Sequence, residues 1–451
     1  MASTDVQAHS GVAAAAPQTY TPAYRSYVLA VLFLGYVVNV MDRGVLAVLI
    51  QSIKQEFSFS DTQLGILSGL TFAFFYSTLG VPIAMLADRT VRKNVLAACC
   101  AMWSVMTALC GVAVGFWSLA AARAGTAVGE AGGSPPSHSL ISDYFKREER
   151  ATALSIYALG VPVGAMLGQF LGGWSNQWHG WRTTFFLIGL PGIAVGALVY
   201  FTVREPARGH SDQAPNAAAA KGAAPPIREV LVFLWRYVSF RHMCLAAALH
   251  SVVWYSGSQL NGAHFARYHQ MQSGEYGTWL ALFSIVGAAG TLLGGILSDR
   301  LSVRFKDRRW YMWVPGVATL IMVPFQFTSY LAHDLTIVVP SFCIMFIFAS
   351  MFFGPSFAVT QGLATLRSRA VATSILLFVQ TFIGLGLGPL LVGMVSDYLQ
   401  NERGMSEAHG LAYGLVVIGL ANIWAAGHYF WGARAIRENF ANTDRLNAAT
   451  A

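Results

Sequence analysis

Four strongly charged side chains lie inside stretches that are otherwise apolar. Asp42 and Arg43 belong to the first such stretch, and Arg123 and Glu130 belong to the fourth. If both stretches cross a membrane as antiparallel helices rising about 1.5 Å per residue, all four charges share one depth. Arg123 and Glu130 also share a helix face, because they are about two turns apart. An unpaired charge there costs roughly 2.5–3.5 kcal/mol, so the sequence predicts partners or water.

Two roles are open to this group of two acids and two bases. The charges could form a structural ion-pair cluster that locks the two helices together. They could instead form a titratable relay in a water-filled cavity, because ionisable groups inside membranes usually mark a substrate or proton path. We favour the relay, in which the forked donors of the arginines would suit a phosphate or carboxylate.

The composition indicates a helical membrane protein. Only 11% of the 451 residues are charged and 55% are apolar, whereas soluble proteins carry about 25% charged residues. The basic residues are sorted by position along the chain rather than gathered in one stripe, which argues against nucleic acid as a partner. The cysteines all fall in apolar stretches, so we expect neither disulfides nor a metal site. They are Cys99, Cys100, Cys110, Cys244 and Cys343.

Twelve apolar stretches are long enough to be membrane helices, and a polar segment divides them into two groups of six. We therefore expect an all-α polytopic membrane protein. The stretches are 27–50, 63–86, 95–115, 118–140, 151–171 and 182–203, followed by 244–266, 276–297, 311–331, 335–357, 370–395 and 410–433.

The segments outside these stretches predict tails and a linker. The run from Ile227 to Phe240 is apolar but too short to span, so we expect an interfacial helix there rather than an extension of the seventh stretch. The expected division is a disordered cytoplasmic tail at 1–24, a six-helix half at 25–204, a cytoplasmic linker at 205–243, a second six-helix half at 244–434 and a cytoplasmic tail at 435–451.

The positions of the 29 Lys and Arg residues predict the orientation. Arg43 and Arg123 lie within stretches, and only four basic residues fall in the connections on one side. All the others fall in the tails and the connections on the opposite side. Because positive residues concentrate on the cytoplasmic side, we expect both termini inside. The four on the outer side are Lys54, Arg182, Arg267 and Arg403.

The two groups of six also repeat each other. An Asp-Arg pair follows the second stretch and again the eighth, and an arginine begins the fifth stretch and again the eleventh. Such a parallel duplication is typical of secondary transporters, whose binding site lies between the halves near the midplane. The matched residues are Asp88-Arg89 with Arg92, Asp299-Arg300 with Arg304, Arg150 and Arg369.

These features resemble the major facilitator superfamily over residues 25–437. The resemblance rests on the doubled Asp-Arg loop, on Arg123 and on Gly160 to Gly164. Within the superfamily the chain most resembles the Spinster group, known for moving sphingolipids and lysolipids. The residues that carry this are Met41-Asp42-Arg43, Arg123, Gly129-Glu130-Ala131, Pro135, Trp181-Arg182 and Arg204-Glu205-Pro206.

The chain departs from the family patterns at three positions. Ala84, Val91 and Ala127 stand where glycine is usual. These departures put the tightness of helix contacts in question and leave the architecture unchanged. The resemblance implies the major facilitator fold, alternating access, no enzymatic activity and protons as the coupling ion with no other cofactor. It also implies Asp42 as protonation site, Arg43 as its partner, and Glu130 and Arg123 as substrate or coupling residues.

The loop residues suit a gate at the cytoplasmic ends. Asp88 can accept hydrogen bonds from Arg369 and the start of the eleventh stretch, and Asp299 can do so from Arg150 and the fifth. These bonds would stabilise a state closed inside and open outside, although loop charges could also serve topology alone. The gating residues implied by the resemblance are Asp88, Arg89, Arg92, Arg150, Asp299, Arg300 and Arg369.

Residues of the seventh and tenth stretches could line a cavity. For most of them, core packing or helix-helix hydrogen bonding is the favoured interpretation. As a set, a polar cluster facing a wall rich in Phe and Met would suit an amphiphile with a charged head. The candidates are His250, Tyr255, Gln259 and Asn261, with Met351, Phe352 and Gln361.

We therefore expect a proton-coupled secondary transporter for an amphipathic lipid such as a sphingolipid or lysophospholipid. A multidrug or small organic-anion antiporter is a second possibility, and a non-transporting membrane receptor is one from another class. An enzyme is disfavoured because the chain has no Gly-x-Ser-x-Gly, His-Glu-x-x-His or Walker motif. The absence of any Asn-x-Ser/Thr sequon favours a bacterial inner membrane. We expect a monomer that contacts membrane lipids.

Overall fold

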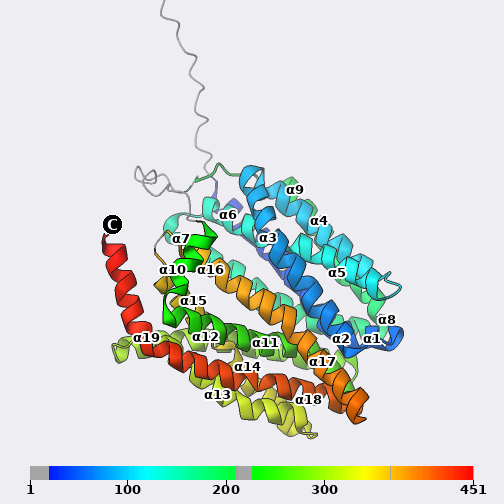
Figure 1. The fold of residues 1–451 in the computed structure, drawn as a ribbon. Helices are drawn as coiled ribbons and strands as arrows, with labels where there is room; N and C mark the ends of the chain where they lie inside the picture. Colours follow the sequence, from blue (N-terminus) through cyan, green and yellow to red (C-terminus); the bar gives the residue numbers. More distant parts are fainter. Residues whose placement is uncertain (1–19, 210, 212–225, 366, 450–451) are drawn as a thin grey trace, which may run out of the picture.

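The computed structural model describes residues 20–209, 211, 226–365 and 367–449, and within these ranges helices are the only regular elements. Figure 1 shows them as two lobes. The first lobe contains α1 (Pro22–Phe57), α2 (Asp61–Gly65), the π-helical turn η1 (Ile66–Leu70), α3 (Thr71–Arg89), α4 (Arg92–Cys110), α5 (Phe116–Ala131), α6 (Ser134–Tyr144), α7 (Arg147–Ala158), α8 (Gly160–Gly189) and α9 (Pro191–Thr202).

The second lobe follows after residue 226. It contains α10 (Ile227–Trp235), α11 (Val238–Tyr268), α12 (Ser273–Arg304), α13 (Trp310–Leu331), α14 (Leu335–Ser350), α15 (Phe353–Leu363), α16 (Arg369–Phe378), the π-helical turn η2 (Val379–Leu385), α17 (Gly386–Arg403), α18 (Glu407–Gly419) and α19 (Ala421–Ala449).

Local sequence signals set the ends of the first helices. Thr21 caps α1 through its side chain, and Pro22 occupies the first helical turn, where its missing N–H costs nothing. Ser58 adopts a left-handed conformation and ends α1. Ser60 and Gln63 then form a reciprocal capping box that starts α2. The tight turn between α1 and α2 follows from these signals.

Nine helical runs in the described part of the chain are long and apolar enough to cross a membrane, or ten if the bent pair α10 and α11 counts as one. The sequence predicted twelve. The fourth predicted stretch is divided between α5 and α6, whose 16 and 11 residues are each too short. The fifth and sixth belong to one run, Glu148–Thr202, which comprises most of α7 with α8 and α9 and has non-helical backbone at Gly180.

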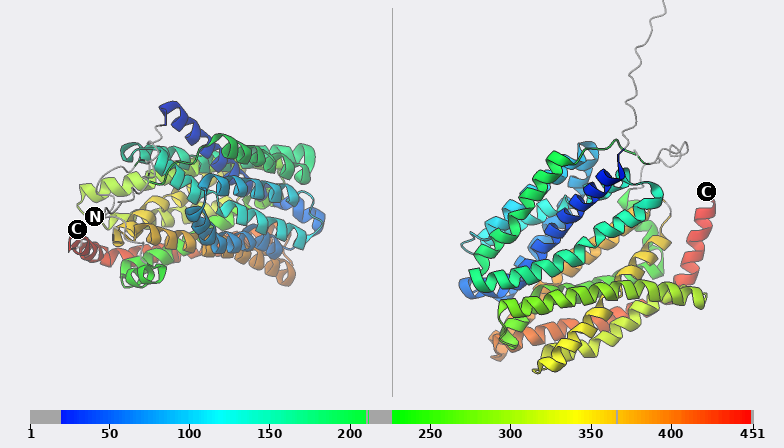
Figure 2. Two further views of the ribbon diagram at one scale, coloured as in Figure 1. Left: turned by 90° about the horizontal axis from the view of Figure 1, so that it is seen from above. Right: turned by 180° about the vertical axis from the view of Figure 1, so that it is seen from behind.

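The two lobes are built alike. In the first, α1 packs on α8 and α4 packs on α5 and α9; in the second, α11 packs on η2 and α17, and α13 packs on α14 and α19. The lobes meet at the end of the molecule farthest from the termini, where α2 contacts α17 and α8 contacts α12. Figure 2 shows them diverging toward the termini.

The linker and the second tail differ in part from the sequence prediction. The interfacial helix predicted for 227–240 is shorter in the structure, where α10 ends at Trp235. The next helix, α11, begins at Val238, six residues before the predicted boundary at 244. The two helices make an angle of 105°. Residues 1–19 and 212–225 of the predicted tail and linker lie outside the described residues. The helix α19 continues through the predicted tail at 435–451 as far as Ala449, because Ile436 and Phe440 are buried in the second lobe.

Candidate functional site

The four charges predicted to share one depth form a single cluster between α1 and α5. Arg43 donates to Glu130 Oε2, and Arg123 Nη1 lies 3.7 Å from Asp42 Oδ1. Thr107 of α4 donates to Asp42 Oδ2. The expectation that Arg43 partners Asp42 is therefore wrong, because successive residues of a helix point about 100° apart.

Burial separates Arg43 from the other three side chains. The side chains of Asp42, Arg123 and Glu130 are at most 2% exposed, whereas that of Arg43 is 31% exposed. Charges buried this deeply are tolerated only as pairs. Arg43 is thus the one member of the cluster that a ligand outside it can reach.

Aromatic rings of α3 hold both arginines. The guanidinium carbon of Arg43 lies 5.0 Å from the ring centre of Phe72 and 4.7 Å from that of Tyr76. Phe72 also faces Arg123, whose guanidinium carbon lies 5.3 Å away. Such cation–π contacts contribute about 0.5–2 kcal/mol each. Tyr255 of α11 packs against the same group, which brings the second lobe to the cluster.

One oxygen of each acid is left without a hydrogen bond. Asp42 Oδ1 and Glu130 Oε1 are buried and accept none, and the two carboxylates are near enough for their negative charges to repel each other. Buried polar atoms in proteins are almost always bonded. A proton bound by either carboxyl group would remove this repulsion.

A row of glycines in α8 positions the charged segment of α1. Side-chain atoms added at Gly164, Gly168 or Gly172 would collide with α1, at Gly168 with the carbonyl group of Met41. Small residues of this kind let membrane helices approach closely. The position of Asp42 and Arg43 therefore depends on this close backbone contact.

The predicted cross-lobe gate pairs are not made in this structure. The carboxylate of Asp88 is 74% exposed and lies 3.8 Å from Arg208, and Asp299 accepts from Tyr311 at 2.7 Å. Arg150 donates to the carbonyl of Ser142 at 2.8 Å. The reason is the divergence of the lobes at this end. Arg89, Arg300 and Arg369 are exposed.

Arg92, which was grouped with the gate, lies in a buried network within the first lobe. It donates to Asp143, to Glu205 at 2.7 Å and to the carbonyl of Pro206 at 2.9 Å. Its side chain is only 1% exposed. Arg92 therefore fastens the start of the linker to α4 and α6 in this structure.

Most of the predicted lining residues serve packing within the second lobe. His250 bonds to the carbonyl of Ala349 at 2.8 Å, and Asn261 accepts from Tyr330 at 3.0 Å. Met351 and Phe352 are buried in its core. Gln361 is exposed and donates to Thr373, and Gln259 is half-buried with an unbonded Oε1. Of the seven, Tyr255 is the residue that packs beside the charge cluster.

A polar junction that the sequence did not predict joins the lobes at the far end. Buried Asp61 accepts from Lys54 and Arg267, both at 2.9 Å, and from Ser396 at 2.6 Å. Asp397 accepts from the amides of Asp61 and Thr62 at 2.9 and 2.8 Å, which caps α2. We call the Lys54, Asp61, Arg267, Ser396 and Asp397 group the far-end junction.

The sequence offered a partial signal for this junction. Lys54 and Arg267 are two of the four basic residues that the sequence predicts for the outer side, so each could have been expected to need an acidic partner. Asp61 and Arg267 are 206 positions apart, so no local pattern pairs them. Phe72, Tyr76 and Thr107 were missed because they are neutral and common in apolar helices.

Comparisons with known proteins identify the family and the fold. The family model for the Major Facilitator Superfamily matches residues 32–389. A solved bacterial homologue of the human lysosomal transporter Spinster, inward-facing and unoccupied, is 32% identical over 93% of this chain and 99% of its own, with a TM-score of 0.86.

Two curated relatives cover most of the chain. An efflux pump of the same type from Mycolicibacterium smegmatis is 30% identical over 413 residues, which is 90% of this chain and 92% of that protein. The sphingosine-1-phosphate transporter SPNS2 of Danio rerio is 26% identical over 84% of this chain and 77% of its own. With its helical lobes and apolar spans, the chain belongs to the Major Facilitator Superfamily, as a membrane transporter similar to the Spinster proteins.

Proposed function

We propose that the protein is a proton-coupled secondary transporter that moves an amphiphile with an anionic head by alternating access. The observation that carries this is the buried cluster of two acids and two arginines in which Arg43 alone is substantially exposed. An exposed forked donor suits a phosphate or carboxylate head. Buried acids next to it are the groups that can carry protons.

The charge balance of the cluster suggests how proton and substrate are linked. With both acids ionised the four charges cancel, and Glu130 holds Arg43. One proton shared by Glu130 and Asp42 leaves one positive charge and weakens the hold on Arg43. An anionic head can then bind Arg43 and restore neutrality. Loss of the proton returns Arg43 to Glu130 and displaces the head.

The lipid class of the substrate is supported by the surroundings of Arg43 and by similarity. Phe72 and Tyr76 of one lobe and Tyr255 of the other provide aromatic surface next to the guanidinium. This combination suits a head that is charged and a body that is apolar. Similarity to the Spinster structure and to a sphingosine-1-phosphate transporter supports the same class.

The finer architecture follows from the same proposal. We place twelve crossings with both termini in the cytoplasm, taking α5 with α6 as one crossing and dividing the run Glu148–Thr202 at Gly180. The far-end junction then closes the outer side, and the structure faces inward. Asp88 would meet Arg369, and Asp299 would meet Arg150, in the outward-facing state. The setting is a bacterial inner membrane, with a monomer that needs no cofactor.

A second candidate function is proton-driven efflux of drugs or small organic anions. It is favoured by the full-length similarity to the efflux pump of Mycolicibacterium smegmatis. The same cluster would serve it, because a proton and a charged substrate can also use the acids and arginines in turn.

A matched set of three compounds tests the substrate class. Lysophosphatidylglycerol carries a phosphodiester and an acyl chain, a monoacylglycerol of equal chain length lacks the charge, and glycerophosphoglycerol lacks the chain. Uptake into proteoliposomes is measured with and without a pH gradient. We expect only the first to be moved and to be accelerated by the gradient. Equal transport of glycerophosphoglycerol would favour the organic-anion function, and no transport of any would contradict the proposal.

A further inference from the structure

The stretch of chain that follows α9 is bound to the surface of the first lobe. We call residues 204–209, which contain no helix or strand, the docked segment. Tyr144 of α6 donates to the carbonyl of Arg204 at one end of the segment. Asp143 of the same helix accepts from the amide of Gly209 at 3.0 Å at the other end. The docked segment is therefore fixed to the first lobe at both of its ends.

The docked segment caps the end of α3 and the start of α4. Glu205 accepts from the amide of Lys93 at 3.0 Å, in the first turn of α4. Arg208 donates to the carbonyls of Ala87 and Thr90 at 2.9 and 3.1 Å, at the end of α3. The helix dipole favours an acid at a helix start and a base at a helix end. These contacts hold Arg208 beside the last turn of α3.

Arg208 is also the basic partner of Asp88 in this structure. Its Nη1 lies 3.8 Å from Asp88 Oδ1. Asp88 belongs to the last turn of α3, where an acid is disfavoured because the free carbonyl groups carry partial negative charge. Arg369, which we proposed as the partner of Asp88 in the outward-facing state, begins α16 on the other lobe. Asp88 thus has one basic partner on its own lobe and a second one proposed on the other lobe.

The second gate residue proposed for the first lobe meets the same stretch of chain. Arg150 donates to Ser211 Oγ at 3.0 Å, and Ser211 donates to the carbonyl of Ser142 at 2.6 Å. Both gate residues of this lobe are therefore in contact with residues that follow α9, at the end where the lobes diverge.

The other end of the linker lies against the helix that begins with Arg369. The helix α10 contacts α16, and its residues Val230 and Leu234 are buried in one apolar cluster with Ala372 and Leu376 of α16. The linker is therefore attached to α3 on one lobe and to α16 on the other. These are the two helices whose ends the proposed gate brings together.

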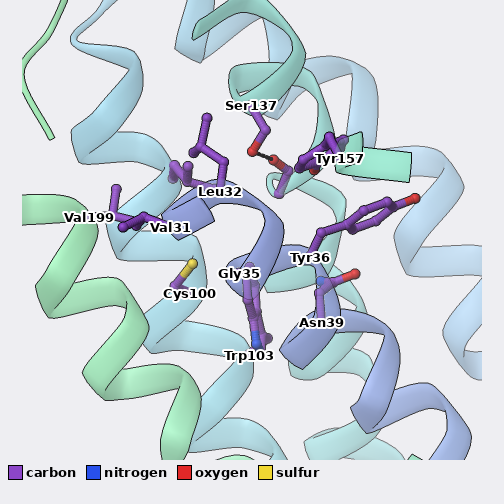
Figure 3. Close-up of a pocket in the computed structure, with 12 residues that line it drawn as sticks. Val31, Leu32, Gly35, Tyr36, Asn39, Cys100, Trp103, Ser137, Tyr157 and Val199 are labelled. Carbon is purple, nitrogen blue, oxygen red and sulfur yellow. Dashed lines mark hydrogen bonds between the residues drawn. The ribbon is translucent and has the colours of Figure 1, made fainter. Parts of the chain in front are cut away.

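The body of the lobe beneath the docked segment is tightly packed. The helix α9, which leads into the segment, lies with α1 and α4 around a small pocket with room for about one water molecule. Figure 3 shows this pocket between Val31 and Leu32 of α1, Cys100 of α4 and Val199 of α9. The side chain of Arg208 is half exposed and does not line the pocket. Its replacement should therefore leave the interior of the lobe unchanged.

We propose that Arg208 and Arg369 bind Asp88 in turn, so that the docked segment stabilises the state in which the gate ends of the lobes are apart. Closure of the gate exchanges one arginine for the other at the same carboxylate. Because Asp88 is paired in both states, the exchange keeps their free energies close, which suits a protein that passes between two states. This inference rests on the proposed alternating access and makes the linker a part of the gate.

Hydrogen exchange at the far-end junction measures how often the lobes separate there. The amides of Asp61 and Thr62 donate to Asp397 across the lobes, so they exchange with solvent when the far ends open. Their exchange rate follows the population of that state, even when the population is small. Mass spectrometry of the peptide that contains both amides gives this rate, with no substrate and no pH gradient present.

Three single variants are compared with the parent. Arg208→Gln removes the first partner of Asp88, and Arg369→Gln removes the second. Arg204→Gln is the matched control, because it removes the same charge from the docked segment, while the guanidinium carbon of Arg204 lies over the ring of Tyr24, 5.5 Å from its centre. Asp88→Asn, with and without Arg208→Gln, tests whether the effect passes through Asp88.

We expect Arg208→Gln to raise the exchange rate about two- to fivefold, because an exposed ion pair contributes modestly, and Arg369→Gln to lower it. Arg204→Gln should match the parent, and Arg208→Gln should add nothing to Asp88→Asn. An unchanged rate in Arg208→Gln would overturn the exchange of partners, and so would an equal rise in the Asp88→Asn background. A parent without gradient-driven lysolipid uptake would instead contradict the proposed function and leave these rates unaffected, so the two failures are distinguishable.

Discussion

Asp42 and Arg43 are neighbours on α1, but they pair with different residues of α5. Arg43 pairs with Glu130, and Asp42 pairs with Arg123, which lies seven residues earlier in the chain. This crossed pairing makes Glu130, rather than Asp42, the acid that controls the exposed arginine. Asp42 has other partners, Arg123 and Thr107, and neither of them contacts Arg43 through a hydrogen bond or ion pair in this structure. In the proposed mechanism, substrate binding at Arg43 is therefore linked most directly to the charge of Glu130.

Replacing Glu130 by Gln separates substrate affinity from pH. The parent should bind lysophosphatidylglycerol more tightly as the pH falls, because protonation frees Arg43. Glu130→Gln removes a charge-assisted bond of about 1.5–3 kcal/mol, so its affinity above neutral pH should exceed the parent's by about tenfold and vary little with pH. Isothermal titration between pH 5 and pH 9 measures this.

The control for this prediction is Glu149→Gln. Glu149 pairs with Arg25 in the same lobe at 2.6 Å, and its side chain is half exposed. Its replacement should leave the affinity profile of the parent unchanged. A Glu130→Gln protein that keeps the parental dependence on pH would show that another group controls Arg43.

Much of the cluster could be predicted from residue types, but its connections could not. Charges inside apolar stretches are unusual enough to identify Asp42, Arg43, Arg123 and Glu130 from the sequence. Which acid meets which arginine depends on helix rotation, and that is set by close contacts such as Gly168 on α1. Aromatic partners such as Phe72 carry no distinguishing signal in a chain with 29 phenylalanines.

At the scale of elements, the contact between α8 and α1 positions the cluster. Gly168 leaves no room for a side chain beside the carbonyl of Met41. Gly168→Ala should therefore push α1 aside and lower stability by about 1–3 kcal/mol, with loss of transport. Gly295 of α12 has nothing within 4 Å of an added Cβ, so Gly295→Ala is the control. Thermal unfolding in detergent should show a lower midpoint only for Gly168→Ala.

The helical continuation of α19 depends on a second set of contacts. Arg437 of α19 and Arg309 both donate to Asp307 in the loop between α12 and α13. These bonds hold the pKa of the Asp307 carboxyl well below its usual range. An aspartate whose pKa is lowered by folding stabilises the folded state at any pH above its ordinary pKa of about 3.9. This contribution is lost as the pH falls toward the lower pKa of the folded state.

A pH series of melting temperatures tests this contact. Asp307→Asn should melt lower than the parent by a constant margin between pH 5 and pH 7, and the margin should shrink below about pH 4. Asp444→Asn serves as control, because the exposed pair of Asp444 with Arg308 should contribute little. A margin that grows on acidification would contradict the assignment.

Helices were predictable wherever hydropathy and length sufficed, as for 311–331, which matches α13 within a residue. The prediction was weaker where other contacts decide the ends. The bend of 105° between α10 and α11 is one example, and the burial of Phe440 in the second lobe is another. Both depend on contacts with residues that are far away in the sequence. The break between the fifth and sixth stretches is made by Gly180 alone, whose backbone is non-helical, and composition does not reveal such a single-residue break.

On the scale of the whole molecule, the far-end junction holds the lobes together. Asp61 lies at its centre with bonds to Lys54 and Arg267, and Arg267 is only 4% exposed. Breaking a buried pair by removing one partner costs about 3–5 kcal/mol. The state of the molecule therefore depends strongly on this carboxylate, although its partners are spread over both lobes and could not be paired from the sequence.

Asp61→Asn should shift the population toward separation of the far ends. Spin labels on exposed Val114 and Met405, one on each lobe, should report a longer distance in at least about half of the molecules. Glu407→Gln is the control, because Glu407 also pairs with Lys54, but at 3.5 Å and with a side chain 55% exposed. A distance distribution in Asp61→Asn identical to that of the parent would show that apolar packing closes this end alone.

The central claim is that the charge cluster moves one proton with each anionic head. Proteoliposomes that contain a pH-sensitive dye allow lysophosphatidylglycerol entry and internal pH to be followed together in the same vesicles. The phosphodiester keeps its charge, so the lipid itself carries no proton. The account predicts that internal acidification accompanies lipid entry in the parent, and that Glu130→Gln abolishes the acidification. Lipid entry by the parent with no change in internal pH would contradict it.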